Sequence, residues 1–167
     1  IARKRRDAWI AFMAFIDAHY RSTWIFRGVG DAENYALIPK IGRESTEYAR
    51  DAERVIFANF KRRAREFVNV SIMTDWELLA LAQHHGLPTR LLDWSTNPLV
   101  AAYFAVTSKP KTEGADARVF AAEAPAMIDV SRSIGPFEWP EVAAFVPAAV
   151  GSRIVAQSGG IGFAIYH

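Results

Sequence analysis

Between Thr74 and Val106 the chain carries a dense series of helix start and stop signals, which leave it little freedom in how to fold. Thr74 followed by Glu77 three residues later is the capping-box pattern, in which two side chains bind the unpaired N–H groups of a helix N-terminus. The helix should end near His85, because Gly86 suits the left-handed conformation that often follows a helix. These signals predict one well-bounded helix over residues 74–85.

A second helix is predicted to begin at Asn97-Pro98, because proline in the first turn of a helix loses no hydrogen bond. Between the two helices, Thr89 to Leu92 is expected to be short and extended at best. The second helix should be largely buried, since most of its side chains are apolar. These are Leu99, Val100, Ala102, Tyr103, Phe104 and Val106.

The rest of the chain shows the periodicities of both helices and strands. Apolar residues recur every three or four positions over Asp7 to Tyr20, and among the charges of Glu47 to Val68, which predicts two amphipathic helices. Residues 28–46 are predicted to form a loop. Strands are predicted at Ser22–Arg27, Ala117–Ala121, Ala143–Val146, Arg153–Gln157 and Ile161–Tyr166. Helices dominate the first two thirds and should pack on a mixed or antiparallel sheet, so the expected class is a single α+β domain.

The length and charge of the chain limit its organisation. It has 167 residues, of which 51% are hydrophobic, so it can bury one sizeable core. We expect one globular unit, in which an N-terminal amphipathic helix over residues 1–23 packs on a domain over residues 24–167. Residues 1–65 hold 14 of the 20 Lys and Arg but 8 of the 18 Asp and Glu. This basic half either suits an anionic partner such as nucleic acid or is an exposed helix face with mixed charges.

Composition also excludes several kinds of chemistry. The chain has no cysteine, so it can form no disulfide and use no thiol nucleophile. No apolar run approaches the roughly 18 residues of a membrane-spanning helix, and no signal peptide is recognisable. We therefore expect a cytoplasmic protein that does not bind membranes. Because the chain begins at Ile1, we also expect a trimmed N-terminus or a piece of a longer protein with a fused domain.

Two kinds of catalytic site are disfavoured by spacing. His84 and His85 are adjacent, so on a helix they point about 100° apart and cannot chelate one ion as a pair four residues apart would. We expect no metal. Ser95 does not lie in the G-x-S-x-G turn that exposes the nucleophile of many hydrolases. A hydrolase triad is therefore a poor interpretation of the serine, histidine and aspartate found here.

The polar residues before the second helix admit two interpretations. Asp93, Ser95, Thr96 and Asn97 either cap the helix that follows or belong to a binding site. Arg90 and Asp93 either pair with each other or face a ligand, because a buried charge without a partner is costly.

Several motifs lie along most of the chain. They are Phe26-Arg27-Gly28, Tyr35 to Pro39 with Arg43, the block from Gln83 to Pro98, and Ala101 to Ala105. Together they strongly resemble the FRG domain, a bacterial and phage family named for its F/Y-R-G motif. The tail from Arg153 to Gln157, with Gly159 and Phe163, resembles the closing motif of that family, so the resemblance spans about residues 24–166.

A second resemblance is to ADP-ribosyltransferases of the arginine-serine-glutamate type. Phe26-Arg27-Gly28 resembles their first motif, in which an arginine at a strand end holds an NAD phosphate, and Trp94-Ser95-Thr96 resembles their serine motif. Gln157 stands where those enzymes have a glutamate that serves the ribose. A glutamine supplies no negative charge to an oxocarbenium-like transition state. The acids considered as replacements are Asp93, Glu138 and Glu141.

These resemblances imply an ADP-ribosyltransferase-like fold, NAD as cofactor, and a toxin or anti-phage effector that modifies a nucleic acid or protein and has a cognate antitoxin. The implied catalytic residues are Arg27, His84, His85, Asp93, Thr96 and Gln157. The implied cofactor-binding residues are Arg27, Gly28, Arg90 and Ser95. The alternative function is a non-catalytic module that binds a nucleotide, RNA or a protein. Arg27 would bind phosphate in either case, unless it forms a structural salt bridge.

Overall fold

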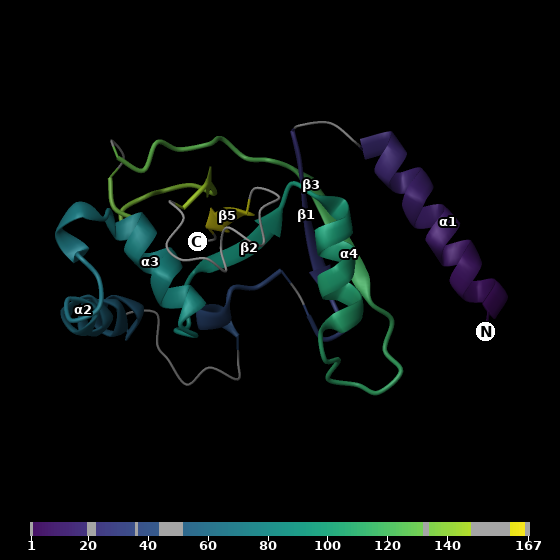
Figure 1. Cartoon of the computed structure of the whole chain (residues 1–167), viewed down its shortest axis with the longest axis horizontal. Helices are drawn as coiled ribbons and strands as arrows, with labels where there is room; N and C mark the ends of the chain where they lie inside the picture. Colours follow the sequence, from purple (N-terminus) through teal and green to yellow (C-terminus); the bar gives the residue numbers. More distant parts are fainter. Residues whose placement is uncertain are drawn as a thin grey trace.

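A computed structural model of the chain describes residues 2–19, 23–35, 37–43, 52–131, 134–147 and 161–165. The helices are α1 (Ala2–His19), α2 (Ala52–Ala64), α3 (Asp75–His84) and α4 (Pro98–Thr107), with 3-10 turns at Lys40–Gly42 and Val70–Ile72. The strands are β1 (Trp24–Val29), β2 (Leu91–Ser95), β3 (Arg118–Glu123), β4 (Ala144–Phe145) and β5 (Ile161–Ile165). Figure 1 shows α2 and α3 at one end of the molecule and α4 and α1 at the other. The α+β class is confirmed.

The strands form one sheet in the order β3-β1-β2-β5-β4, and neighbouring strands are antiparallel. The central strand is β2, which pairs with β1 through Phe26 and Ser95, and with β5 along its length. The extended segment predicted at residues 89–92 therefore begins and ends too early in the sequence. Residues 91–95 form a strand because they pair with β1 and β5, and the local sequence pattern does not reveal partners that lie far away in the chain. The predicted strand at residues 153–157 lies outside the described residues.

The helix signals of the central segment are confirmed. Thr74 Oγ1 accepts a hydrogen bond from the Glu77 N–H at 3.3 Å, and Glu77 Oε2 accepts one from the Thr74 N–H at 2.7 Å. Gly86 has a φ of 89°, as a residue that follows a helix often does. Asn97 caps α4, because its Oδ1 accepts from the Leu99 N–H at 2.9 Å. No helix in the described ranges is long and apolar enough to cross a membrane.

Helix α4 lies directly against β1, and glycines in the strand and just after it make this possible. A Cβ added to Gly28 would lie 1.8 Å from the main-chain oxygen of Ala101, and one added to Gly30 would lie 2.4 Å from that of Ser108. The small residues Ala101 and Ala105 are buried at this contact. The prediction that α4 is largely buried was wrong. The helix backbone lies so close to β1 that only the face with small side chains fits against the strand. Its larger apolar residues are instead exposed, namely Leu99, Tyr103, Phe104 and Val106.

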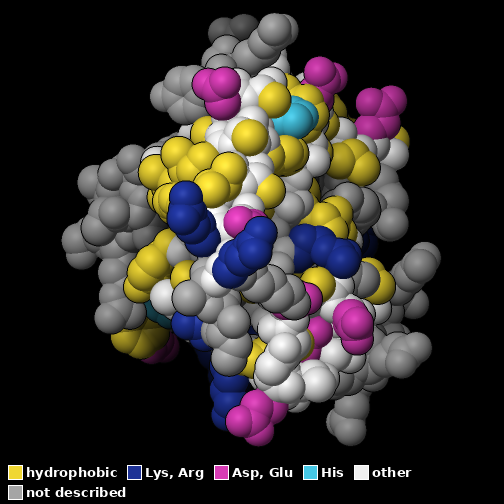
Figure 2. All heavy atoms as spheres, turned by 90° about the vertical axis from the view of Figure 1, so that its right-hand side faces the viewer, with side chains coloured by type: hydrophobic (Ala, Val, Ile, Leu, Met, Phe, Trp, Pro, Cys, Tyr) yellow, Lys and Arg dark blue, Asp and Glu magenta, His cyan; other side chains and the backbone are white. Residues whose placement is uncertain are grey.

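Helix α1 begins earlier than predicted and lies at the edge of the fold (Figure 1). Phe15 contacts Phe26 edge to face, and His19 contacts Trp24 in the same way. The predicted apolar stripe is only partly used, since Trp9 is 56% exposed. Figure 2, which looks onto this side of the molecule, shows hydrophobic side chains at the surface beside Lys and Arg.

The hydrophobic core has two parts. One joins α2, α3, β2 and β4 around Trp76, and the other lies around Ile25, Leu92 and Trp94. Successive side chains of a strand point to opposite faces of the sheet, and β2 therefore contributes to both parts. Leu91 contacts the first part and Leu92 the second.

Candidate functional site

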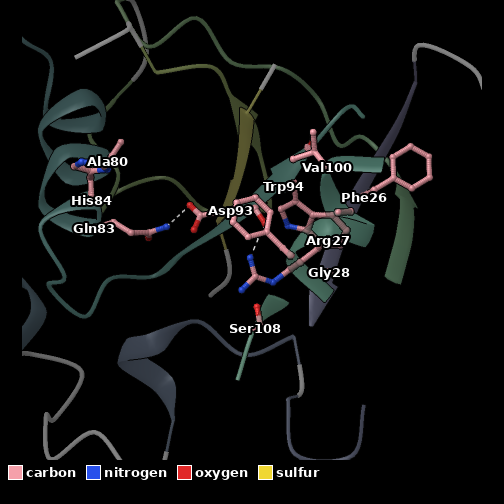
Figure 3. Close-up of a pocket in the computed structure, with 13 residues that line it drawn as sticks. Phe26, Arg27, Gly28, Ala80, Gln83, His84, Asp93, Trp94, Val100 and Ser108 are labelled. Carbon is pink, nitrogen blue, oxygen red and sulfur yellow. Dashed lines mark hydrogen bonds between the residues drawn. The ribbon is translucent and has the colours of Figure 1, made fainter. Parts of the chain in front are cut away.

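A cavity of about 410 Å³ opens between β1, α3, β2 and α4 (Figure 3). This volume lies within the range of roughly 300 to 1,000 Å³ that is typical of small-molecule sites. The walls come from elements far apart in the chain. They are formed by Phe26, Arg27, Gly28, Ala80, Gln83, His84, Asp93, Trp94, Ser95, Val100, Ala101, Phe104 and Ser108.

Arg27 enters the cavity from β1. Its Nη1 donates a hydrogen bond to the main-chain oxygen of Asp93 at 2.5 Å (Figure 3). A guanidinium has five N–H donors, and the described residues accept one of them. Burial lowers the pKa of Arg27, the negative charge of Asp93 raises it, and the positive charge of Arg43 lowers it. The group stays protonated, because an arginine does not lose its proton in proteins.

Asp93 lies on β2 with its carboxyl group in the cavity. Its Oδ1 accepts from Nε2 of Gln83 at 2.5 Å (Figure 3). The side chain is open to solvent through the cavity, while the protein around it removes much of its hydration. This desolvation raises the pKa of Asp93, against the effects of Arg27, the Gln83 hydrogen bond and His84, which lower it. The cavity therefore holds a carboxyl group and a guanidinium close together.

The structure brings five of the predicted site residues into this cavity. Arg27 and Gly28 come from β1, His84 from the last turn of α3, and Asp93 and Ser95 from β2. Ser95 is 6% exposed, and its Oγ accepts from the Asn97 N–H at 3.0 Å. The capping interpretation thus holds for Asn97, whereas Asp93 and Ser95 are strand residues of the cavity wall.

The other predicted site residues lie elsewhere. Thr96 is exposed, and His85 follows α3 with its ring 6.4 Å from that of Phe60; neither lines the cavity. Gln157 lies outside the described residues. Of the acids considered as its replacement, Asp93 lines the cavity and the other two, Glu138 and Glu141, do not.

Arg90 pairs with Glu53 of α2 in this fold. Its Nε lies 2.9 Å from Oε2 of Glu53, and its main-chain N–H donates to the other carboxylate oxygen at 2.8 Å. Its guanidinium lies over the ring of Phe137, 4.8 Å from the ring centre. The predicted alternative of a pair between Arg90 and Asp93 was wrong, because α2 supplies the partner. Arg90 also does not line the cavity, where a cofactor-binding role would place it.

Gln83 and Thr89 belong to the block from Gln83 to Pro98, but neither was among the implied catalytic or cofactor-binding residues. Gln83 contacts Asp93 directly, and Thr89 donates its hydroxyl proton to Oε1 of Gln83. Gln83 lies in the last turn of α3 and Thr89 in the connection that follows, so no helix or strand periodicity relates the two residues. Burial of the small polar Thr89, which is 2% exposed, becomes visible only in the structure.

The described residues offer no cluster of three or more His, Asp and Glu side chains that could hold a metal ion. The described wall of the cavity presents hydrogen-bonding and charged side chains together with apolar ones. Such a site can bind a ligand that carries an anionic group, donor groups and a flat apolar part.

Comparison with known proteins gives one result. The family model of the FRG domain matches residues 22–114, which include Arg27, His84 and Asp93. No curated protein and no solved structure matches the chain. The resembling tail at residues 153–163 lies beyond the matched range. The matched range covers more than half of the sequence, and the chain therefore belongs to the FRG domain family.

Proposed function

We propose that the cavity binds NAD or a related nucleotide, and that the protein is an ADP-ribosyltransferase-like enzyme that modifies a macromolecule. The supporting observation is that Arg27 and Asp93, which lie far apart in the chain, face the same cavity. A guanidinium beside an apolar wall can bind a phosphate group through paired N–H donors. The positive charge of Arg43, close enough to lower the pKa of Arg27, would add to the attraction for an anion.

Asp93 would supply the negative charge that Gln157 lacks. Transfer of ADP-ribose breaks the bond between nicotinamide and ribose, and nicotinamide leaves with the bonding electron pair. Positive charge then develops on the ribose, and a nearby carboxylate stabilises it. The acceptor forms the new bond to the same ribose carbon and loses a proton.

Replacing Asp93 by asparagine tests its role in turnover. Asp93→Asn keeps the size of the side chain and removes its charge, so we expect NAD cleavage or transfer to fall by about 100-fold or more. The assay follows labelled NAD in the presence of bacterial lysate, RNA and DNA. Wild-type protein that neither cleaves NAD nor transfers label would contradict the enzymatic proposal.

Replacing Arg27 by alanine tests the anion site. Arg27→Ala should weaken NAD binding by about tenfold or more, because it removes a charge-assisted contact. Calorimetric titration measures the affinity, and a melting curve checks that the protein still folds. The matched control is Arg118→Ala on β3, an exposed arginine outside the cavity, which should bind NAD as the wild type does.

A non-catalytic nucleotide-binding module is the second candidate. It is favoured by the pairing within the site, because Arg27 already donates to Asp93 and Asp93 accepts from Gln83. NAD binding without any cleavage or transfer would support this function. Binding of RNA with a steep salt dependence and no NAD binding would point instead to a nucleic-acid partner.

A further inference from the structure

The amide of Gln83 is held between Thr89 and Asp93, and the carboxylate of Asp93 fixes its orientation. The buried Thr89 Oγ1 accepts a hydrogen bond from the Leu91 N–H at 3.3 Å and contacts Oε1 of Gln83. A threonine hydroxyl can both donate and accept, whereas an ionised carboxylate can only accept. The Asp93 carboxylate therefore requires Nε2 of Gln83 to point at it, and Oε1 then accepts the hydroxyl proton of Thr89. Swapping the two amide atoms would set the carbonyl oxygen of Gln83 against the carboxylate, where neither group can donate.

Asp93 accepts hydrogen bonds from two side chains of the cavity wall, one at its carboxylate and one at its main-chain oxygen. Nε2 of Gln83 donates to Oδ1 at 2.5 Å, and Arg27 donates to the main-chain oxygen of the same residue at 2.5 Å. The charged groups that act on the carboxylate are Arg27 from β1 and His84 from α3. Among the described residues none donates to Oδ2, and Asp93 is open to the cavity. One carboxylate oxygen is thus held by Gln83, while the other has no donor among the described residues.

We propose that Gln83, held in place by the hydroxyl of Thr89, is a positioning residue that holds Asp93 as a hydrogen-bond acceptor for hydroxyl groups of the ligand. This wall of the cavity then selects a sugar with hydroxyl donors, while Arg27 selects an anionic group on the same ligand. The choice of ribose hydroxyls rests on the proposed function. The positioning of Asp93 does not, because it follows from contacts within the protein.

The positioning step can be measured without any ligand. In protein labelled with ¹³C in its aspartate carboxyl groups, the Asp93 signal is assigned from its loss in Asp93→Asn and followed against pH. Gln83→Leu removes the donor to Oδ1, so the pKa of Asp93 should rise by about one pH unit. Thr89→Val removes the hydroxyl and keeps the shape, and should raise the pKa in the same direction. Thr89→Ser keeps the hydroxyl and should restore the wild-type pKa.

The matched control for the threonine is Thr107→Val. Thr107 is exposed on α4, and its hydroxyl donates to the main-chain oxygen of Tyr103. This change should leave the titration of Asp93 as it is in the wild type. If Gln83→Leu and Thr89→Val fold, as judged by their melting curves, and titrate like the wild type, the positioning role is wrong. If either fails to fold, Gln83→Asn decides, because it withdraws the donor from Asp93 while keeping an amide. A titration of Asp93 in Gln83→Asn that matches the wild type would contradict the positioning role.

Selection of a hydroxyl donor is tested with NAD and with its analogue in which the nicotinamide ribose lacks the 2′ hydroxyl. The wild type should bind the analogue about tenfold more weakly than NAD, and Gln83→Leu and Asp93→Asn should reduce this preference. Equal binding of the two ligands by the wild type would contradict the proposed selection. Failure of NAD to bind at all would overturn the proposed function, whereas the titration would still decide whether Gln83 positions Asp93.

Discussion

At the level of single residues, the glycine after Arg27 has a steric role. Gly28 lines the cavity, and its missing side chain lets the backbone of α4 pack against β1. The same contact sets the position of β1 and therefore of Arg27. The glycine of the F/Y-R-G motif thus serves the site through packing, and the arginine beside it serves through charge.

Gly28→Ala should destabilise the protein. The added Cβ would clash with the main-chain oxygen of Ala101, which cannot move without moving α4, and overpacking of this kind costs about 1–3 kcal/mol or more. Urea denaturation measures the change. In the control Gly42→Ala the nearest atom is a flexible methyl group of Ile38 at 3.2 Å, so the change should stay below about 1 kcal/mol. Equal stabilities of the two variants would disprove the steric argument.

At the level of elements, ion pairs in different environments attach α2 to the rest of the fold, and two of them differ sharply in exposure. Glu53 is 3% exposed and binds both the side chain and the main-chain N–H of Arg90 at the start of β2. The neighbouring Arg54 pairs with Glu138 at 2.8 Å, and both of these side chains are more than half exposed. Only the first pair should matter for stability, because water screens the second.

The two pairs can be compared directly. Glu53→Ala leaves Arg90 without its carboxylate, and we expect a loss of about 3 kcal/mol in the free energy of unfolding. Arg54→Ala should cost less than about 1 kcal/mol, because its pair is exposed. Urea denaturation of both variants at the same pH gives the two values. A cost for Arg54→Ala equal to that for Glu53→Ala would mean that burial does not decide the strength of these pairs.

For the molecule as a whole, Asp31 ties the segment after β1 to the one before β3. It is fully buried, and its two oxygens accept from the N–H groups of Glu33, Asn34 and Thr112 and from the side chain of Asn34. Burial alone would raise the pKa of Asp31, but these hydrogen bonds outweigh it and lower the pKa from 3.8 to about 2. Ionised Asp31 therefore stabilises the arrangement of β1, α4 and β3.

The sign of the pH dependence follows from this lowered pKa. The contribution of Asp31 is fully present above the unfolded-state value and is lost as the pH falls from about 4 toward about 2. Stability measured by urea denaturation should fall in this range, and Asp31→Asn should remove that part of the fall while lowering stability at neutral pH. Asp116→Asn, at an exposed aspartate nearby, should keep the acid-dependent loss, because Asp31 is still present. Wild-type stability that stays constant down to pH 2 would contradict the role of Asp31.

Local rules were sufficient where a few neighbouring residues satisfy one another. The capping box of Thr74 and Glu77, the cap at Asn97 and the turn at Gly86 were predictable, because their hydrogen bonds and dihedral angles lie within one helix end. The length of β2 was not, since its partners lie far away in the chain. The exposure of the larger apolar residues of α4 was also not predicted, because hydrophobicity does not reveal that the contact with β1 admits only small residues.

The sequence was enough to establish the α+β class, the bounds of α3, the start of α4 and membership of the FRG family, and it singled out the block around Arg27 and Asp93 as the candidate site. Only the three-dimensional arrangement distinguished the residues of that block that line the cavity from those that do not. Arg90 pairs with Glu53 outside the cavity, whereas Gln83, His84 and Asp93 line the same cavity as Arg27. The physical reason is that capping depends on neighbours in sequence, whereas the partner of a charged side chain depends on which elements pack beside it.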